Sequence, residues 1–350
     1  MRKYGALLAL LTGAAWSQTP ISVPSAPVRL QPDPLAASVQ LSPPGRLAGI
    51  PPSARLALGP LTEDERNRPS SRPGLPVVGI VRQLPSDRGA DGQCERLGDG
   101  VTVWRVELES PGAAGIRVRF EDFDVGQGRV WLYADDQTLG PYSGRGIFGD
   151  GEFWTGVIFA DRMVIEYEPA PGSACTEAPP FRIREIVHLW ETPLSATTGK
   201  SDRRHAAAWC HLDASCYPEY AAQASGVAHY TYVSGGTSYA CSGALLNTRP
   251  YTGIPYFLTA YHCIKNDTEA RTVNAYWFYQ TPYCNGPPPS KSSLPYQTQG
   301  ATFLVGKDIP EGDFSLLRLT SVPNASNLYF LGWTTIEPNQ GERAVGIHHP

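Results

Sequence analysis

The 350-residue sequence predicts an all-β fold in which a β-sandwich is followed by a second β-rich domain. Three observations support this prediction. Short segments alternate between apolar and polar residues, which is the period of a half-buried strand. Turns that contain glycine and proline separate these segments. The sequence has no internal repeat, no heptad pattern and no long amphipathic helix, which are the signs of helical and repeat folds.

The first 17 residues predict a secretory signal peptide. Arg2 and Lys3 form a short positive region, and residues 5–15 form an apolar stretch. The small residues Ala15 and Ser17 then place a cleavage site after position 17. A buried N-terminal helix is the alternative, which the charge, the length and the order of small residues disfavour. Because no apolar run reaches about eighteen residues, we expect a secreted protein, extracellular or periplasmic, with no membrane partner.

Residues 18–75 are rich in proline, alanine, serine and leucine, which is typical of an extended linker or propeptide segment. The following unit, residues 76–190, is predicted to be a β-sandwich that serves as a pro- or accessory domain. In this unit Ile116 and Val118 alternate with Arg117, so one strand face is expected to be buried and the other exposed. Further strands are expected over 130–133, 163–167 and 183–189.

Aromatic residues of the sandwich have two interpretations. They could form a sugar-binding platform, but alternating aromatics in a sandwich more often belong to the core. The residues concerned are Trp104, Trp131, Tyr133, Tyr142 and Trp154.

A polar stretch within residues 191–209 predicts an exposed junction that proteases can cut. It contains few apolar residues and three basic ones, so Lys200, Arg203 and Arg204 are the candidate processing sites. The second β-rich domain begins at Cys210 and runs to Pro350.

The composition excludes several classes of function. The formal net charge is −4, which gives no signal for a nucleic-acid partner. No H-E-x-x-H or C-x-x-C motif is present, and adjacent histidines on a strand, such as His348 and His349, point to opposite faces. We therefore expect neither a metal site nor a cofactor.

Two segments of the second domain carry the chemistry. The first, FLTAYHC over residues 257–263, predicts an apolar strand that delivers His262 to a turn next to Cys263. A bridge from Cys263 to Cys241 would close a 22-residue loop, worth about 3 kcal/mol, and would fix the backbone beside a histidine suited to general-base work. The second, DFSLLRL over residues 313–319, places Asp313 before a strand, where a buried carboxylate could accept a hydrogen bond from an imidazole.

These segments resemble those of trypsin-like serine peptidases. C-[SG]-G-x-L-[LI] at 241–246 precedes L-T-A-x-H-C at 258–263, and D-F-x-L-L-x-L begins 51 residues after His262 (313 − 262). Over residues 210–350 the chain is more closely similar to bacterial lysyl endopeptidases. CHLDASC at 210–216, AYWFYQ at 275–280 and GIHHP at 346–350 carry that resemblance.

The resemblance implies a trypsin-like double β-barrel, with the first barrel present and the second incomplete. It implies His262 as general base, Asp313 as its orienting partner and a preference for lysine, which makes Lys200 the first candidate for self-processing. In the family the serine nucleophile lies downstream of the stretch that matches 346–350, in a Gly-x-Ser-Gly turn, so the resemblance implies that it lies beyond Pro350. Ser242 and Ser315 lie within other strands and lack that setting. The chain as given would then be inactive.

The sequence has seven cysteines, and an odd number in an exported protein indicates a free thiol, an intermolecular bridge or a missing partner. Cys94 and Cys175 both lie in the sandwich and are expected to pair. The resemblance implies the pairs Cys241–Cys263 and Cys216–Cys284, which leaves Cys210 unpaired here.

Together these observations predict the precursor, or zymogen, of a secreted serine endopeptidase. Its partners would be protein or peptide substrates and its own propeptide. The alternatives are an exported pseudoprotease and a surface- or carbohydrate-binding protein whose function lies in the sandwich.

Overall fold

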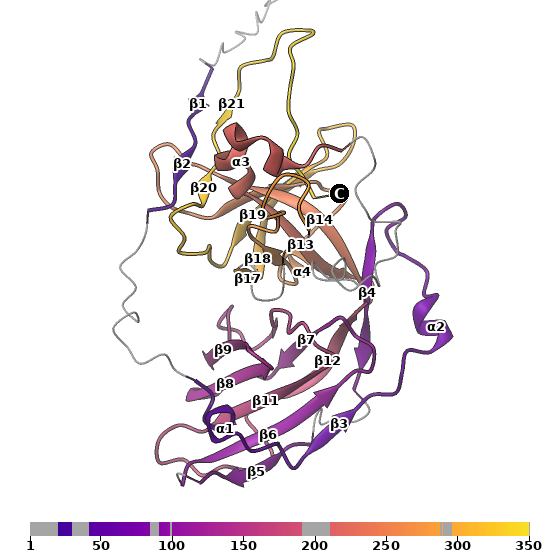
Figure 1. Ribbon diagram of the computed structural model, residues 1–350, viewed down its shortest axis with the longest axis vertical. Helices are drawn as coiled ribbons and strands as arrows, with labels where there is room; N and C mark the ends of the chain where they lie inside the picture. Colours follow the sequence, from indigo (N-terminus) through magenta and orange to yellow (C-terminus); the bar gives the residue numbers. More distant parts are fainter. Residues whose placement is uncertain are drawn as a thin grey trace, which may run out of the picture.

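The computed structural model describes residues 20–29, 42–84, 91–98, 100–190, 211–287, 289 and 296–349. The expected signal peptide, the processing sites Lys200, Arg203 and Arg204, and the unpaired Cys210 lie outside these residues. Figure 1 shows a sandwich in the lower half and a barrel in the upper half, with one long strand running between them. Among the described residues, no helix combines the length and apolar composition needed to cross a membrane.

The lower half is a sandwich of two layers whose strands pair antiparallel, except for one edge strand of the first layer that pairs in parallel. The first layer has the order β3-β6-β11-β8-β9, with β5 also paired to β6. Its strands are β3 (Arg55–Ala57), β5 (Gln93–Arg96), β6 (Thr102–Glu109), β8 (Gly126–Ala134), β9 (Gln137–Gly144) and β11 (Arg162–Glu168). The second layer has the order β10-β7-β12-β4. Its strands are β4 (Val77–Gln83), β7 (Gly115–Glu121), β10 (Phe153–Trp154) and β12 (Arg182–Leu189).

Aromatic and branched residues fill the space between the two layers. Phe120 contacts the rings of Phe123, Phe153 and Phe181, at centroid distances of 5.2, 5.3 and 5.3 Å. The five aromatics considered as a sugar platform are all buried, at most 8% exposed. The sandwich therefore lacks the exposed aromatic row, within the described residues, that a carbohydrate-binding face of this kind would need.

The upper half is a nearly closed β-barrel. Its strands follow the order β17-β16-β13-β14-β15-β19-β18. They are β13 (Val227–Ser234), β14 (Thr237–Leu246), β15 (Tyr256–Thr259), β16 (Asn274–Tyr276), β17 (Gln297–Gln299), β18 (Ala301–Lys307) and β19 (Phe314–Leu319). β17 and β18, the first and last strands of this order, are consecutive in the chain. Gly300 forms the turn between them with a φ of 78°, which a glycine adopts without strain. Tyr230, Phe257 and Trp277 are fully buried in the barrel core.

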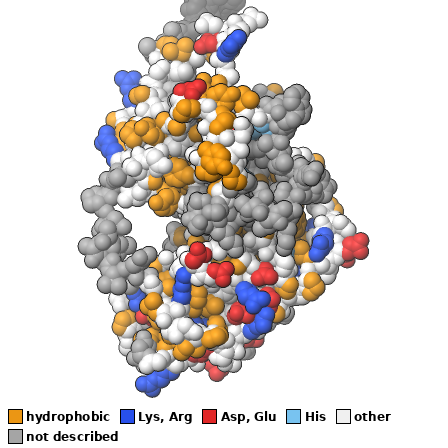
Figure 2. All heavy atoms as spheres, in the orientation of Figure 1, with side chains coloured by type: hydrophobic (Ala, Val, Ile, Leu, Met, Phe, Trp, Pro, Cys, Tyr) orange, Lys and Arg blue, Asp and Glu red, His pale blue; other side chains and the backbone are white. Residues whose placement is uncertain are grey.

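Short helices lie between the strands of the barrel in the sequence and before its first strand. They are the 3₁₀ turns η3 (Ala214–Cys216) and η4 (Pro218–Tyr220), and the α-helices α3 (Ala221–Ser225) and α4 (Asp267–Ala270). Figure 2 shows charged side chains of both signs over the sandwich half of this face, and more hydrophobic side chains over the barrel half.

One strand belongs to both halves. β4 pairs with β12 of the sandwich on one side and with β14 of the barrel on the other, which makes a continuous eleven-stranded sheet. Ile80 is thereby opposite His188 and also opposite Thr237. A separate apolar cluster, which we call the interface core, fills the contact between the halves and contains Val78, Val81, Trp154, Val157, Phe159, Val187, Leu189, Ala240 and Tyr276.

The interface core corrects the interpretation of strand β7. Alternation predicted an exposed face that carries Arg117, but this residue is fully buried because the barrel covers that face. Its Nε donates to the Thr155 carbonyl at 2.8 Å and its Nη1 to the Thr272 carbonyl of the barrel at 2.9 Å. Burial lowers the pKa of Arg117 to about 10.

The segment 18–75 is not simply an extended linker, because its described parts pack against the rest of the molecule. β1 (Ser22–Val23) pairs with β21 (Trp333–Thr334), and β2 (Ala26–Pro27) pairs with β20 (Tyr329–Phe330). The segment also forms two short helices, α1 (Pro44–Ala48) and α2 (Glu63–Arg66). In α1, the N–H of Gly45 donates to the buried carboxylate of Glu166 at 2.9 Å. The prolines fit because edge strands and first helical turns tolerate a missing N–H.

Candidate active site

His262 lies in the tight turn that follows strand β15. The carbonyl of Ala260 accepts the N–H groups of Cys263 and Ile264, both at 3.2 Å, which closes the turn. Cys263 is bonded to Cys241 of the neighbouring strand β14, with their Cα atoms 6.7 Å apart. The disulfide therefore attaches the turn to the sheet at the residue directly after His262.

Strand pairing brings Asp313 to this turn. β15 and β19 run antiparallel, with Thr259 opposite Ser315, so the end of one strand lies beside the start of the other. Asp313 directly precedes β19 and has a φ of 46°. Residues that are 51 positions apart in the sequence thus meet at one edge of the barrel.

Both carboxylate oxygens of Asp313 contact His262. Oδ2 lies 2.6 Å from the imidazole Nδ1, and Oδ1 accepts the His262 backbone N–H at 2.9 Å. An imidazole held in this way has its Nδ1 protonated when neutral, which leaves Nε2 as the basic nitrogen. The contacts therefore fix the orientation of the ring and the tautomer together.

Asp313 is more exposed than the sequence suggested. Its side chain is 23% exposed rather than buried, because the carboxylate lies at the rim of the barrel; the side chain of His262 is 51% exposed. Partial burial acts to raise the pKa of Asp313, but the hydrogen bonds from His262 outweigh it and hold that pKa below its ordinary value. The carboxylate is thus charged at neutral pH.

The two serines near these strands have other partners. Ser315 is buried and donates to the carbonyl of Ile264 at 2.6 Å. The Ser242 hydroxyl donates to the His349 carbonyl at 3.1 Å and accepts the His349 N–H at 2.8 Å. Neither hydroxyl is placed as a partner of the His262 imidazole.

Four other histidines of the described residues form two pairs that the sequence did not suggest. Residues 348–349 are not in a strand; the His349 ring lies 5.5 Å from His229 and stacks on Tyr279, and His348 lies 5.2 Å from His211. Burial lowers the pKa of His229 to about 3 and that of His349 to about 4. No alternating or motif signal reveals such pairs, because they join segments more than 100 residues apart.

Among the described residues, one group has the closeness that a metal site needs, namely Cys241, His262 and Cys263. Its two sulfurs are joined in a disulfide and cannot act as thiolate ligands. The structure also joins Cys94 to Cys175 and Cys216 to Cys284, with Cα–Cα distances of 5.9 and 4.4 Å. These three bridges are the pairs expected from the sequence.

A nearly closed β-barrel with a histidine–aspartate pair at its rim is the arrangement of the trypsin-like class of fold. Residues 205–350 match the family described as "Lysyl endopeptidase, C-terminal domain". Over 307 residues the chain is 27% identical to a lysyl endopeptidase of Pseudomonas aeruginosa, covering 80% of this chain and 63% of that protein. The chain thus spans less than two thirds of the relative's length. Both matches are thus similarities to lysyl endopeptidases.

Proposed function

We propose that this chain is part of a secreted precursor of a serine endopeptidase, in which His262 is the general base and Asp313 orients it. The contact between Nδ1 of His262 and the carboxylate of Asp313 carries this proposal. In the reaction, Nε2 of His262 takes the proton of a serine hydroxyl as that oxygen attacks the peptide carbonyl. The imidazolium then gives the proton to the leaving amine, while Asp313 stabilises the positive charge.

Neither Ser242 nor Ser315 is proposed as the nucleophile, because both hydroxyls bind other groups. Cleavage after lysine is proposed from the name of the Pseudomonas relative. Residues 76–190 would act as the propeptide, and cutting between 191 and 209, first at Lys200, would release the peptidase.

The complete gene product tests this function with peptide substrates that contain lysine. His262→Ala is expected to lower kcat by about 10⁶-fold and Asp313→Asn by roughly 10⁴-fold, as in other serine peptidases. Asp308→Asn is the matched control. This exposed carboxylate lies on the same loop as Asp313, between β18 and β19, and does not contact His262. It should leave kcat unchanged.

Peptidase activity that survives both His262→Ala and Asp313→Asn would overturn the assignment of these residues. A complete product that folds but cleaves no peptide would favour the pseudoprotease instead. An N-terminal sequence of the active protein that still contains residues 76–190 would contradict the propeptide role.

A further inference from the structure

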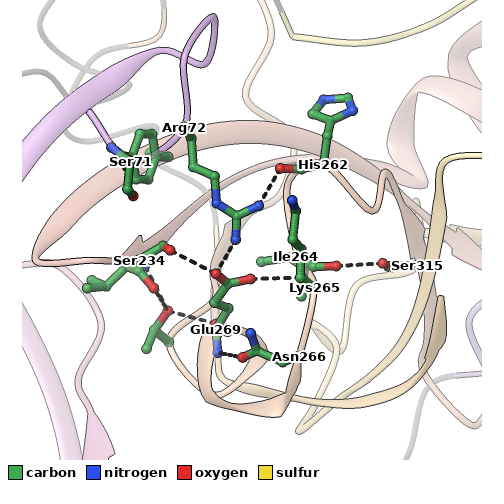
Figure 3. A network of polar contacts seen from close by, with 12 residues as sticks. Ser71, Arg72, Ser234, His262, Ile264, Lys265, Asn266, Glu269 and Ser315 are labelled. Atoms are coloured by element: carbon green, nitrogen blue, oxygen red, sulfur yellow. Dashed lines mark hydrogen bonds and ion pairs between the residues drawn. The ribbon is translucent and has the colours of Figure 1, made fainter. Parts of the chain in front are cut away.

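Arg72 reaches the His262 turn from the N-terminal part of the chain, outside the residues that match the peptidase family. Its Nη1 donates to the backbone carbonyl of His262 at 2.9 Å, and its Nη2 forms an ion pair with Glu269. Both side chains are largely buried, at 12% and 8% exposure. Figure 3 shows the guanidinium between the two acceptors, with the imidazole of His262 pointing away from this network.

The carboxylate of Glu269 binds backbone and side-chain groups around the loop that follows His262. One of its oxygens accepts the backbone N–H of Lys265 at 2.7 Å, and the other accepts the hydroxyl of Ser234 at 2.8 Å. The N–H of Glu269 donates to the side chain of Asn266, which caps helix α4. The loop from His262 to Glu269 is thus folded around one buried carboxylate, whose charge Arg72 compensates.

The backbone of His262 is consequently held at both of its polar groups. Its N–H is bound by Asp313, and its carbonyl is bound by Arg72. A guanidinium suits this place because its planar fork can serve two acceptors at once, and bonds to charged groups are stronger than neutral ones. Loss of Arg72 would free the carbonyl and leave Glu269 as a buried carboxylate without its cation.

Further contacts fix the segment that carries Arg72. The hydroxyl of Tyr239 lies 3.1 Å from the hydroxyls of Ser70 and Ser71, and it accepts the Ser71 N–H at 3.0 Å. Arg68 donates to the carbonyl of Gly236 at 3.2 Å. Strand β4 follows five residues after Arg72 (77 − 72) and pairs with β14 of the barrel. The guanidinium is therefore delivered by a segment that is itself bound to the barrel.

We propose that Arg72 is a positioning residue for His262 in the uncut precursor, supplied to the barrel by the N-terminal part of the same chain. The N-terminal part thereby sets the conformation of the loop that presents the imidazole to Asp313. The importance of this for catalysis rests on the proposed function, but the physical coupling between Arg72 and the loop does not. It follows that a barrel without residues 68–72 has a looser His262 turn.

Amide hydrogen exchange on the full chain tests the coupling without any use of peptidase activity. Arg72→Met is expected to speed exchange at the His262 and Lys265 amides by about 10- to 100-fold, the range for losing one hydrogen bond to a charged group. Arg72→Lys keeps the charge beside Glu269 but cannot bridge two acceptors, so an intermediate increase is expected. Because Glu269 loses its cation in Arg72→Met, the melting temperature should fall, so the exchange of β8 in the sandwich is the reference, and the increase at His262 and Lys265 should exceed any increase there.

Arg68→Met is the matched control, because it removes another contact between the same segment and the barrel without touching the His262 loop. Unchanged exchange at His262 in Arg72→Met, or an equal increase in both methionine variants, would overturn the proposal. If the Arg72→Met protein does not fold, Arg72→Lys is compared with Arg68→Met instead. Equal exchange rates at the His262 amide in these two variants would also overturn the proposal. Absence of peptidase activity in the complete product would leave this result standing, so the two proposals fail separately.

Discussion

At the residue scale, His188 shows how burial sets the charge of a side chain. It lies in β12 and is 1% exposed, with its Nδ1 2.8 Å from the hydroxyl of Ser110. Arg82 donates to the same hydroxyl at 3.2 Å and is paired with Glu65. Burial first, and the positive charge of Arg82 second, lower the pKa of His188 to about 4.

This lowered pKa predicts a loss of stability on acidification. Between about pH 6.5 and pH 4 the unfolded chain binds a proton at this position and the folded chain does not, so the free energy of unfolding falls as the pH falls. Urea unfolding at pH 7 and pH 4.5 should show that His188→Gln loses about 2 kcal/mol less than the parent over this interval. Equal losses in the two proteins would show that His188 does not contribute to the pH dependence.

At the scale of elements, β4 and β12 approach each other closely at Gly79. A Cβ on Gly79 would lie 2.6 Å from the carbonyl of His188 and 2.8 Å from the Cδ2 of Leu189. One of these atoms belongs to the backbone of a paired strand and cannot move aside. The glycine therefore allows β4 to fit between the sandwich and the barrel.

Gly79→Ala is expected to lower the free energy of unfolding by about 1–3 kcal/mol, the usual cost of overpacking. Urea unfolding measures this change. Gly59→Ala is the matched control, because a Cβ there meets no atom within 4 Å, and it should leave stability within about 0.5 kcal/mol. A Gly79→Ala protein as stable as the Gly59→Ala control would contradict the close approach of β4 to β12 at this glycine.

The same scale shows what the sequence could and could not predict. Local alternation indicated strands such as β7, β8 and β11, and the order of short motifs indicated that His262 and Asp313 belong to one site. The exposure of Arg117 was predicted wrongly, because alternation reports two faces and not what covers them. The partners of β4 and the pairing of β1 with β21 depend on contacts more than 100 residues away, for which a strand's own residues give no signal.

At the scale of the whole molecule, the sandwich and the barrel are joined by more than the shared strand. Arg271 of the barrel pairs with Asp150 of the sandwich at 2.6 Å, and Tyr142 donates to Gln299 at 2.7 Å. The interface core adds nine buried apolar residues between the halves. Separation of the halves would expose this core and break the β4–β14 ladder, so neither half is expected to unfold alone without a large penalty.

The two halves are therefore expected to unfold in one cooperative transition, although chains of two domains commonly show several. Scanning calorimetry should give a single peak whose calorimetric and van't Hoff enthalpies agree. The slowest amides of β7 in the sandwich and of β13 in the barrel should exchange with the same free energy of opening, because both require the global transition. Gly79→Ala displaces β4, the strand that the two halves share, so it should broaden or split the peak, whereas Gly59→Ala should not. Two separate transitions in the parent protein would show that the eleven-stranded sheet does not couple the halves.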